Sequence, residues 1–135
     1  MLQFYFLSIV INAIVGYIHL TGDDEGVLEL GGRFSLKDET SKLVLGILSV
    51  LTGLFKVLSP IEGDLPVLGD LLPAATGILG GFILIFEYYK NRSSLDDSEE
   101  TEKIGHVLVV NKKIIGVVCL ITAVLHFLFP KVLLL

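Results

Sequence analysis

The chain has 135 residues, of which 53% are hydrophobic and 19% are charged, and it carries 14 glycines. This apolar share and a mean hydropathy of +0.79 exclude a disordered chain and predict an integral membrane protein rather than a water-soluble domain. The single cysteine excludes a disulfide framework and a cysteine-based zinc site. The net charge of −5 argues against nucleic acid as a partner.

Four apolar segments approach the roughly 20 residues that a helix needs to cross a bilayer. The first lacks the basic start and the small-residue cleavage site of a signal peptide, so it is expected to remain as a helix. The predicted spans cover residues 2–20, 42–59, 70–89 and 112–130. The predicted fold class is therefore an all-α membrane protein, a four-transmembrane-helix bundle that forms one membrane domain over residues 1–135.

Polar residues and prolines mark the predicted helix ends. Ser41, Asp70 and Asn111 stand where N-cap side chains would satisfy the first free amides of the second, third and fourth helices. Pro60 and Pro130 are expected to stop the second and fourth helices, because proline cannot continue a helical hydrogen-bond ladder.

The positions of lysine and arginine predict the orientation in the membrane. Eight of the ten basic residues lie in or directly beside the loops 21–41 and 90–111. Short loops rich in these residues stay in the cytoplasm. Because the number of spans is even, both termini are expected on the non-cytoplasmic side, in the plasma membrane, with Tyr5 at the outer interface.

The predicted cytoplasmic loops contain some structure. The segment from Val27 to Lys37 alternates around Gly31 and Gly32, which predicts a small β-hairpin with a two-residue turn. Residues 106–110 have a strand-like composition and would add a third strand. The acidic segment 93–103 has no apolar period, so it is expected to be a solvated linker or a frayed helical turn.

An offset of 70 residues aligns the second span with the fourth. Because polar and helix-terminating residues fall in step, the alignment favours a duplication, with repeats over about residues 1–62 and 70–135. Each repeat crosses the membrane twice, so the two repeats would run parallel, as in some transporters. The matching residues are Lys42, Gly46, Thr52, Leu58 and Pro60 with Lys112, Gly116, Thr122, Leu128 and Pro130.

Small residues recur at helical spacing and form candidate packing seams. In lipid, helices associate largely through the close backbone approach that such residues allow. The seams serve either packing within one bundle or an interface with another copy or a partner. The seam residues are Gly46, Ser49, Gly53, Gly77, Gly81, Gly116, Cys119 and Ala123.

Lys56 and His126 are the first candidate site residues. Both continue the small-residue stripes about one turn inside the outer end, and the repeat aligns them with each other. Ionisable residues inside a membrane are costly and therefore suggest a functional site. Such a pair would exchange a proton or bind an anionic group, either a lipid phosphate or one of the carboxylates of Glu62, Asp64 and Asp70. Alternatively, Lys56 reaches the headgroups and His126 hydrogen-bonds locally.

Asn12 lies in the middle of the first span and completes the candidate ligand or ion site, although a buried amide also serves simply to link helices. His19 and Glu87, at the inner ends of the first and third spans, either pair or are wetted at the interface. No metal or cofactor is expected. His19, His106 and His126 are predicted to lie at different depths, so they would not hold one haem.

No nucleophile triad or phosphate-binding motif occurs, so no enzyme is expected. The leading hypothesis is a non-enzymatic structural or accessory subunit of a membrane assembly or homo-oligomer, because apolar helices with small-residue seams supply association without an evident conduction path. The alternatives are a small homo-oligomeric transporter or channel and a lipid-binding membrane protein. In helix number and size the chain resembles the small multidrug transporters, but its first span has no carboxylate, which does not fit proton-coupled cation export.

Overall fold

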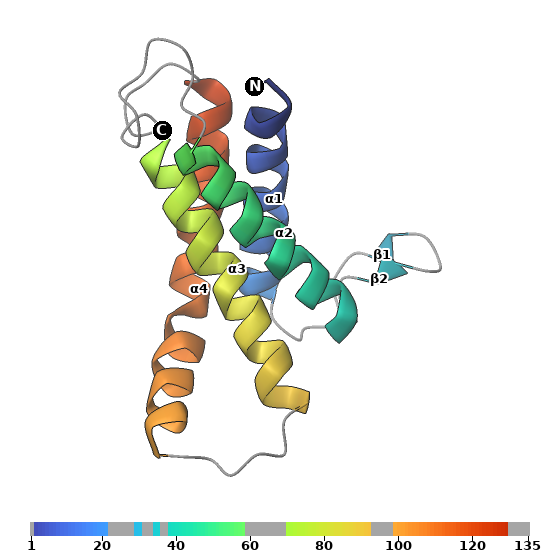
Figure 1. Ribbon diagram of the computed structural model, residues 1–135, viewed down its shortest axis with the longest axis vertical. Coiled ribbons are helices and arrows are strands. Elements are labelled where there is room, and N and C mark those ends of the chain that lie inside the picture. Colours follow the sequence, from blue (N-terminus) through green and yellow to red (C-terminus); the bar gives the residue numbers. More distant parts are fainter. Residues whose placement is uncertain are drawn as a thin grey trace.

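The computed structural model describes residues 2–21, 29–30, 34–35, 38–58, 70–92 and 99–129. Four helices form a bundle (Figure 1), and each is long and apolar enough to cross a membrane. The predicted all-helical bundle of four apolar helices is thus confirmed. The helices are α1 (Leu2–Thr21), α2 (Glu39–Leu58), α3 (Leu71–Arg92) and α4 (Glu99–Leu128).

The helices pack as two close pairs. α2 lies mainly against α3, and α1 lies mainly against α4, while smaller contacts join α1 to α3, α1 to α2 and α3 to α4. The start of α1 and the end of α4 lie at the same end of the bundle (Figure 1). Within the described residues, α1 and α3 therefore occupy the centre, and α2 and α4 flank them.

Each close pair is built on a reciprocal contact between two glycines. A methyl group added at Gly46 would lie 2.8 Å from the carbonyl oxygen of Gly81, and one at Gly81 would lie 2.6 Å from the carbonyl oxygen of Gly46. A methyl group added at Gly16 would lie 2.8 Å from the carbonyl oxygen of Gly116, and one at Gly116 would lie 3.0 Å from the carbonyl oxygen of Gly16. Only glycine allows backbones to approach this closely, so these positions bring α2 onto α3 and α1 onto α4.

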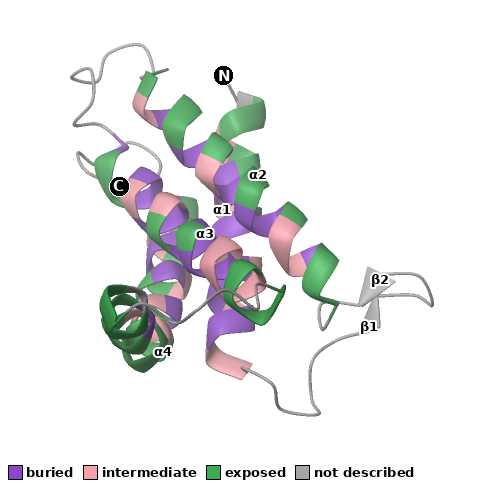
Figure 2. Cartoon of the chain, turned by 60° about the horizontal axis from the view of Figure 1, so that its bottom comes forward, coloured by how far each residue is buried: buried purple, intermediate pink, exposed green. Residues whose placement is uncertain are grey.

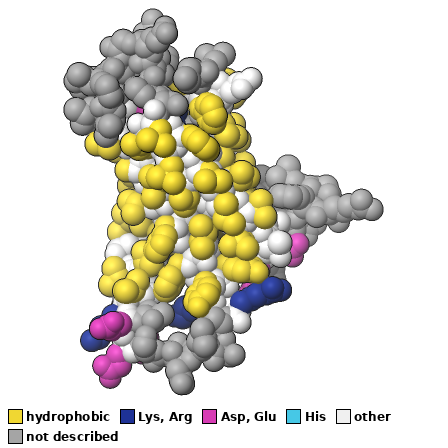
Figure 3. Space-filling model, in the orientation of Figure 1, with side chains coloured by type: hydrophobic (Ala, Val, Ile, Leu, Met, Phe, Trp, Pro, Cys, Tyr) yellow, Lys and Arg dark blue, Asp and Glu magenta, His cyan; other side chains and the backbone are white. Residues whose placement is uncertain are grey.

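The interior is more polar than the exterior, the reverse of a water-soluble protein. Among the buried residues that the structure describes, polar and charged side chains outnumber hydrophobic ones, and buried positions line the facing sides of the helices (Figure 2). Hydrophobic side chains cover the face of the bundle that Figure 3 shows, and large hydrophobic side chains are exposed on all four helices. The buried polar residues are Ser8, Asn12, His19, Ser41, Ser49, Thr52, Lys56, Asp70, Thr76, Thr122 and His126.

The N-terminal end of α2 differs from the prediction. The helix begins at Glu39, and the amide of Lys42 donates to the carbonyl oxygen of Asp38, so Asp38 holds the N-cap position. Ser41, the predicted cap, lies inside the first turn and is buried. Aspartate and serine are equally good caps, and Glu39 in the first turn adds a favourable interaction with the helix dipole.

α4 also begins earlier than predicted. It starts at Glu99 and continues without a break through residues 106–110 and Asn111, so the predicted third strand and the predicted cap at Asn111 are wrong, and the predicted loop 90–111 is largely helical. Three glutamates in the first turn of the helix favour this start through the helix dipole. They outweigh the weak strand preference of the valines that follow.

Between α1 and α2, the structure describes two strands of two residues each, β1 (Glu29–Leu30) and β2 (Phe34–Ser35). They pair antiparallel with Leu30 opposite Phe34, and the predicted two-residue glycine turn at Gly31 and Gly32 lies outside the described residues. This short pairing does not establish the longer hairpin predicted from Val27 to Lys37, whose other residues lie outside the described part. Pro60 and Pro130 also lie outside it.

The glycine contacts can be tested by adding one methyl group. We expect Gly46→Ala to lower the free energy of unfolding in detergent by about 1–3 kcal/mol, because the new methyl group would overlap the backbone of Gly81. Gly77→Ala is the matched control, since its methyl group would meet no atom closer than 3.5 Å. Thermal unfolding followed by circular dichroism measures both, and equal losses would show that close approach at Gly46 does not hold the pair together.

Candidate functional site

Three ionisable side chains meet inside the bundle at the end where α1 begins and α4 ends. The Nζ atom of Lys56 lies 3.0 Å from Oδ2 of Asp70 and 3.2 Å from Nε2 of His126. That ring nitrogen lies 3.8 Å from Oδ1 of Asp70. All three residues are at most 5% exposed, so they form one buried cluster contributed by α2, the start of α3, and α4.

Tyr5 on α1 closes the cluster. Its hydroxyl donates to the backbone carbonyl of His126 at 2.6 Å, and the two rings lie 4.6 Å apart between centroids. The Nζ atom of Lys56 lies 5.3 Å from the centre of the Tyr5 ring, within the range of a cation–π interaction. Every helix therefore supplies one residue to this cluster, which we call the terminal cluster: Tyr5, Lys56, Asp70 and His126.

The sequence found part of the terminal cluster. Lys56 and His126 were candidate site residues at matching positions of the repeat, and Asp70 was one of three candidate carboxylates; the other two lie outside the described residues. Asp70 has the N-cap position of α3, with its carbonyl accepting from Ala74, but its carboxylate turns to Lys56. Tyr5 was expected at the outer membrane interface. Tyr5 and Ser8 are three residues apart and therefore lie on one helix face, and this spacing is the signal that could have placed Tyr5 in the cluster.

Asn12 forms a second polar centre, in the middle of the bundle. Its amide nitrogen donates to the carbonyl of Pro73 at 3.1 Å, and its amide oxygen accepts from the Thr76 hydroxyl at 3.2 Å. Both partners belong to α3. The amide thus links the two central helices, whereas Lys56 contacts His126 at the end of the bundle, so the three predicted site residues occupy two levels.

Hydroxyl and thiol groups continue the polar interior beyond Asn12. Ser49 donates to the carbonyl of Gly77 at 2.6 Å, and the thiol of Cys119 donates to the carbonyl of Thr76 at 3.5 Å. A methyl group at Gly77 would lie 3.7 Å from the Asn12 amide oxygen and from the Ser49 hydroxyl. These groups therefore surround one short stretch of α3.

His19 lies deeper than the sequence indicated. It is 1% exposed, and its Nε2 lies 3.0 Å from the carbonyl oxygen of Gly80. A methyl group at Gly80 would come within 3.2 Å of the Cys119 thiol and 3.8 Å of this imidazole. The expectation that His19 is wetted at the interface is wrong, because the side chain points to α3 rather than along the membrane surface.

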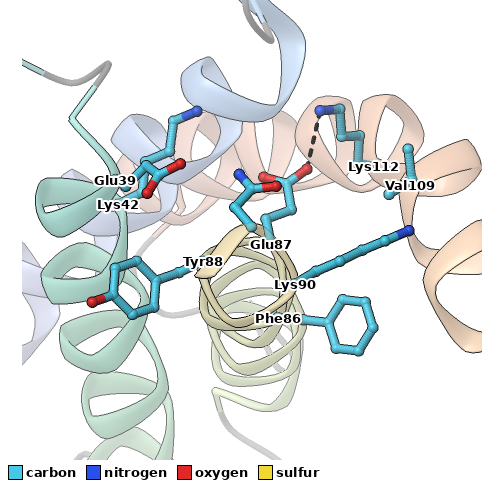
Figure 4. Close-up of a pocket in the computed structure, with 9 residues that line it drawn as sticks. Glu39, Lys42, Phe86, Glu87, Tyr88, Lys90, Val109 and Lys112 are labelled. Atoms are coloured by element: carbon cyan, nitrogen blue, oxygen red, sulfur yellow. Dashed lines mark hydrogen bonds and ion pairs between the residues drawn. The ribbon is translucent and has the colours of Figure 1, made fainter. Parts of the chain in front are cut away.

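The opposite end of the bundle carries a second set of charges. Lys112 on α4 pairs with Glu87 on α3 at 3.0 Å, each about one-fifth exposed, so Glu87 pairs with Lys112 rather than with His19. Beside the pair lies a pocket of about 250 Å³, lined by Glu39, Lys42, Phe86, Glu87, Tyr88, Lys90, Asn91, Val109 and Lys112 (Figure 4).

The predicted seam residues lie between helices of this one chain. Besides the two glycine pairs, Gly53 packs on Ala74 and Ile78, and Gly77 lies beside Ser49. Cys119 and Ala123 are buried. His106, expected in a loop, lies exposed on α4. Within residues 2–21, 38–58, 70–92 and 99–129, no three histidine, cysteine or acidic side chains gather as metal ligands do.

Comparisons with known proteins place the chain among uncharacterized proteins. The model of an uncharacterized protein family matches residues 1–126. An uncharacterized protein of Treponema pallidum (strain Nichols) is 36% identical to the chain over 133 residues, which cover 98% of each. No solved structure matches the chain.

Whether Asp70 compensates the charge of Lys56 in the terminal cluster can be tested by measuring the free energy of unfolding of variants. Asp70→Asn leaves the Lys56 ammonium buried without its carboxylate, so we expect the free energy of unfolding in detergent to fall by about 3–5 kcal/mol. The double variant Lys56→Met/Asp70→Asn removes both charges and should recover most of that loss.

Glu87→Gln is the control at the other end of the bundle. Its ion pair is partly exposed, and we expect a loss of about 1 kcal/mol or less. Thermal unfolding and titration with sodium dodecyl sulfate measure all three variants. If the double variant is as unstable as Asp70→Asn, the carboxylate does not act by compensating Lys56.

Proposed function

The chain belongs to the family whose model matches residues 1–126, and we propose that it is an integral membrane protein that moves protons across the bilayer through the interior of its own bundle. The observation that carries this proposal is the contact between Lys56, Asp70 and His126, all buried beneath an apolar exterior. Ionisable residues in this position are rare because they are costly, and they commonly mark ion pathways and proton relays.

The contact between Lys56 and His126 suggests a resting protonation state. If Lys56 is an ammonium, which has only donors, Nε2 of the ring would accept in this contact and the imidazole would be neutral. With Asp70 ionised, the cluster then carries no net charge, which is the state that a low-dielectric site tolerates best. This state leaves the ring as the group that can take up a proton.

A proton that reaches Nε2 of His126 removes the acceptor that Lys56 uses and makes the ring a second cation. The Asp70 carboxylate, 3.8 Å from the same nitrogen, then stands between two cations. The terminal cluster thus has two states that differ by one proton, and the same carboxylate partly compensates both. When His126 takes up the proton, its hydrogen bond with Lys56 is exchanged for an ion pair with Asp70, and release of the proton reverses this exchange.

A row of polar groups leads from the terminal cluster toward the opposite end. Ser8 lies one turn from Tyr5 on the same face of α1, and it accepts from the Asn12 amide at 3.5 Å. Thr76 and the Cys119 thiol follow, and His19 lies beyond them. A water molecule or a side-chain rotation must complete the route between Asn12 and His19, because glycine contacts close the helices there.

The charge distribution suggests the direction of this route. The terminal cluster lies at the end where α1 begins, and most lysines and arginines of the helices lie at the other end. By the positive-inside rule, the terminal cluster then faces the non-cytoplasmic side and the Glu87–Lys112 pair faces the cytoplasm. A proton entering from outside would meet His126 first and leave past His19.

The accessory-subunit hypothesis is the second candidate. Its support is the N-terminal part of α4, which extends beyond α1 and α2 (Figure 1) and exposes Ile104, Val107 and Val110. The structure weakens two reasons for this hypothesis. The seam glycines pack within this chain rather than against a partner, and the interior contains charged residues rather than apolar ones alone. Lipid binding at Lys56 and His126 has less support, because both are buried and Asp70 already supplies the anion.

Proton movement is tested in liposomes that contain the purified full chain and a pH-sensitive dye. An imposed pH gradient should collapse faster than in protein-free liposomes when potassium and valinomycin remove the membrane potential. His126→Gln keeps a hydrogen-bond acceptor for Lys56 but cannot take up the proton, so we expect the flux to fall at least about tenfold.

His106→Gln is the matched control on the same helix, where the exposed histidine lies outside the row; its flux should equal that of the wild type. Circular dichroism must show that both variants are folded. Wild-type flux no greater than that of empty liposomes, or unchanged flux in His126→Gln, would contradict the proposal. A stoichiometric partner found by cross-linking in native membranes, together with absent flux, would favour the accessory subunit.

A further inference from the structure

The pocket at the cytoplasmic-facing end of the proposed topology lies where an apolar surface meets a charged one. Hydrophobic side chains cover the middle of the bundle, and lysine, arginine and acidic side chains gather below them (Figure 3). The pocket is formed by the start of α2, the end of α3 and the middle of α4 at this boundary. Phospholipid headgroups occupy this level of a membrane protein.

The lining of the pocket suits one negative charge. Lys42, Lys90 and Lys112 supply three cations from three helices, and Glu39 and Glu87 supply two anions, which leaves one net positive charge. A phosphodiester carries one negative charge and accepts several hydrogen bonds. Basic pockets between membrane helices on the cytoplasmic side are a recurring setting for anionic headgroups.

Neighbouring side chains extend this setting. Asn91 and Tyr88 also line the pocket. Arg92, which is not part of the lining, donates to the Tyr88 hydroxyl at 3.2 Å and lies 5.5 Å from its ring. Figure 4 shows the Glu87 carboxylate turned to Lys112 while Lys42 and Lys90 lie on either side of α3.

The surface beside the pocket suits acyl chains. α3 exposes Phe82 and Leu79 toward the middle of the membrane, on the side that α2 and α4 leave open. The pocket itself, about 250 Å³, is smaller than the roughly 300–1,000 Å³ of sites for drug-sized molecules. It has room for a headgroup phosphate but not for a whole lipid.

We propose that this pocket binds the phosphate of an anionic phospholipid, with Lys42 and Lys90 as its principal cations and the acyl chains along α3. Lys112 serves mainly to neutralise Glu87, which would otherwise repel the phosphate. The site lies at the opposite end from the terminal cluster, and the proposal does not depend on proton movement.

Native mass spectrometry of the purified full chain in mild detergent tests this site, with phosphatidylglycerol, phosphatidylcholine or inorganic phosphate as the added probe. We expect one phosphatidylglycerol per chain, weak binding of phosphatidylcholine, and no displacement by an equal concentration of inorganic phosphate. Lys42→Gln and Lys90→Gln should each weaken phosphatidylglycerol binding about fivefold, the usual contribution of one lysine near a headgroup.

Lys113→Gln is the matched control, because Lys113 neighbours Lys112 on α4 but is exposed and outside the lining. It should bind phosphatidylglycerol as the wild type does. Equal weakening in all three variants would mean that only overall charge matters and would overturn the proposal. Equal binding of phosphatidylcholine would indicate acyl-chain binding alone, and ready displacement by inorganic phosphate would indicate a free-phosphate site; either result overturns it.

Discussion

The arrangement of the helices in the bundle depends on the ion pair between Lys56 and Asp70. Two opposite charges 3.0 Å apart and almost without exposure survive inside a membrane protein only if each remains beside the other and their remaining hydrogen-bonding capacity is used. His126 and Tyr5 meet part of that need. Because the members of the cluster come from four helices, satisfying the charges also fixes how these helices meet.

An inverted distribution of polarity follows from the same constraint. An apolar exterior is favourable in the hydrocarbon of a membrane, but the hydrophobic effect does not drive helices together there. The bundle instead uses close glycine contacts at Gly46 and Gly116 and hydrogen bonds such as that of Asn12 to Pro73. Interior polarity therefore serves the association of the helices.

Much of this arrangement could be predicted from the sequence, because its signals are periodic. The 70-residue offset pairs Lys56 with His126, and the apolar runs locate four helices. The sequence could not choose Asp70, because a carboxylate at a helix start serves equally as a cap and as an ion-pair partner. It placed His19 too near water, because distance from the end of an apolar run gives depth but not the direction of a side chain.

The two reciprocal glycine contacts divide the bundle into two close pairs of helices. They hold α1 to α4 and α2 to α3 at backbone distance, so a motion of the bundle costs least where one pair slides on the other. The bond from Tyr5 to His126 lies within the first pair, and the Lys56–Asp70 bridge lies within the second. The hydrogen bond between Lys56 and His126 joins the two pairs at one end of the bundle, and the bonds of Asn12 to Pro73 and of His19 to Gly80 join them further along, so polar contacts at several levels, rather than glycine contacts, hold one pair to the other.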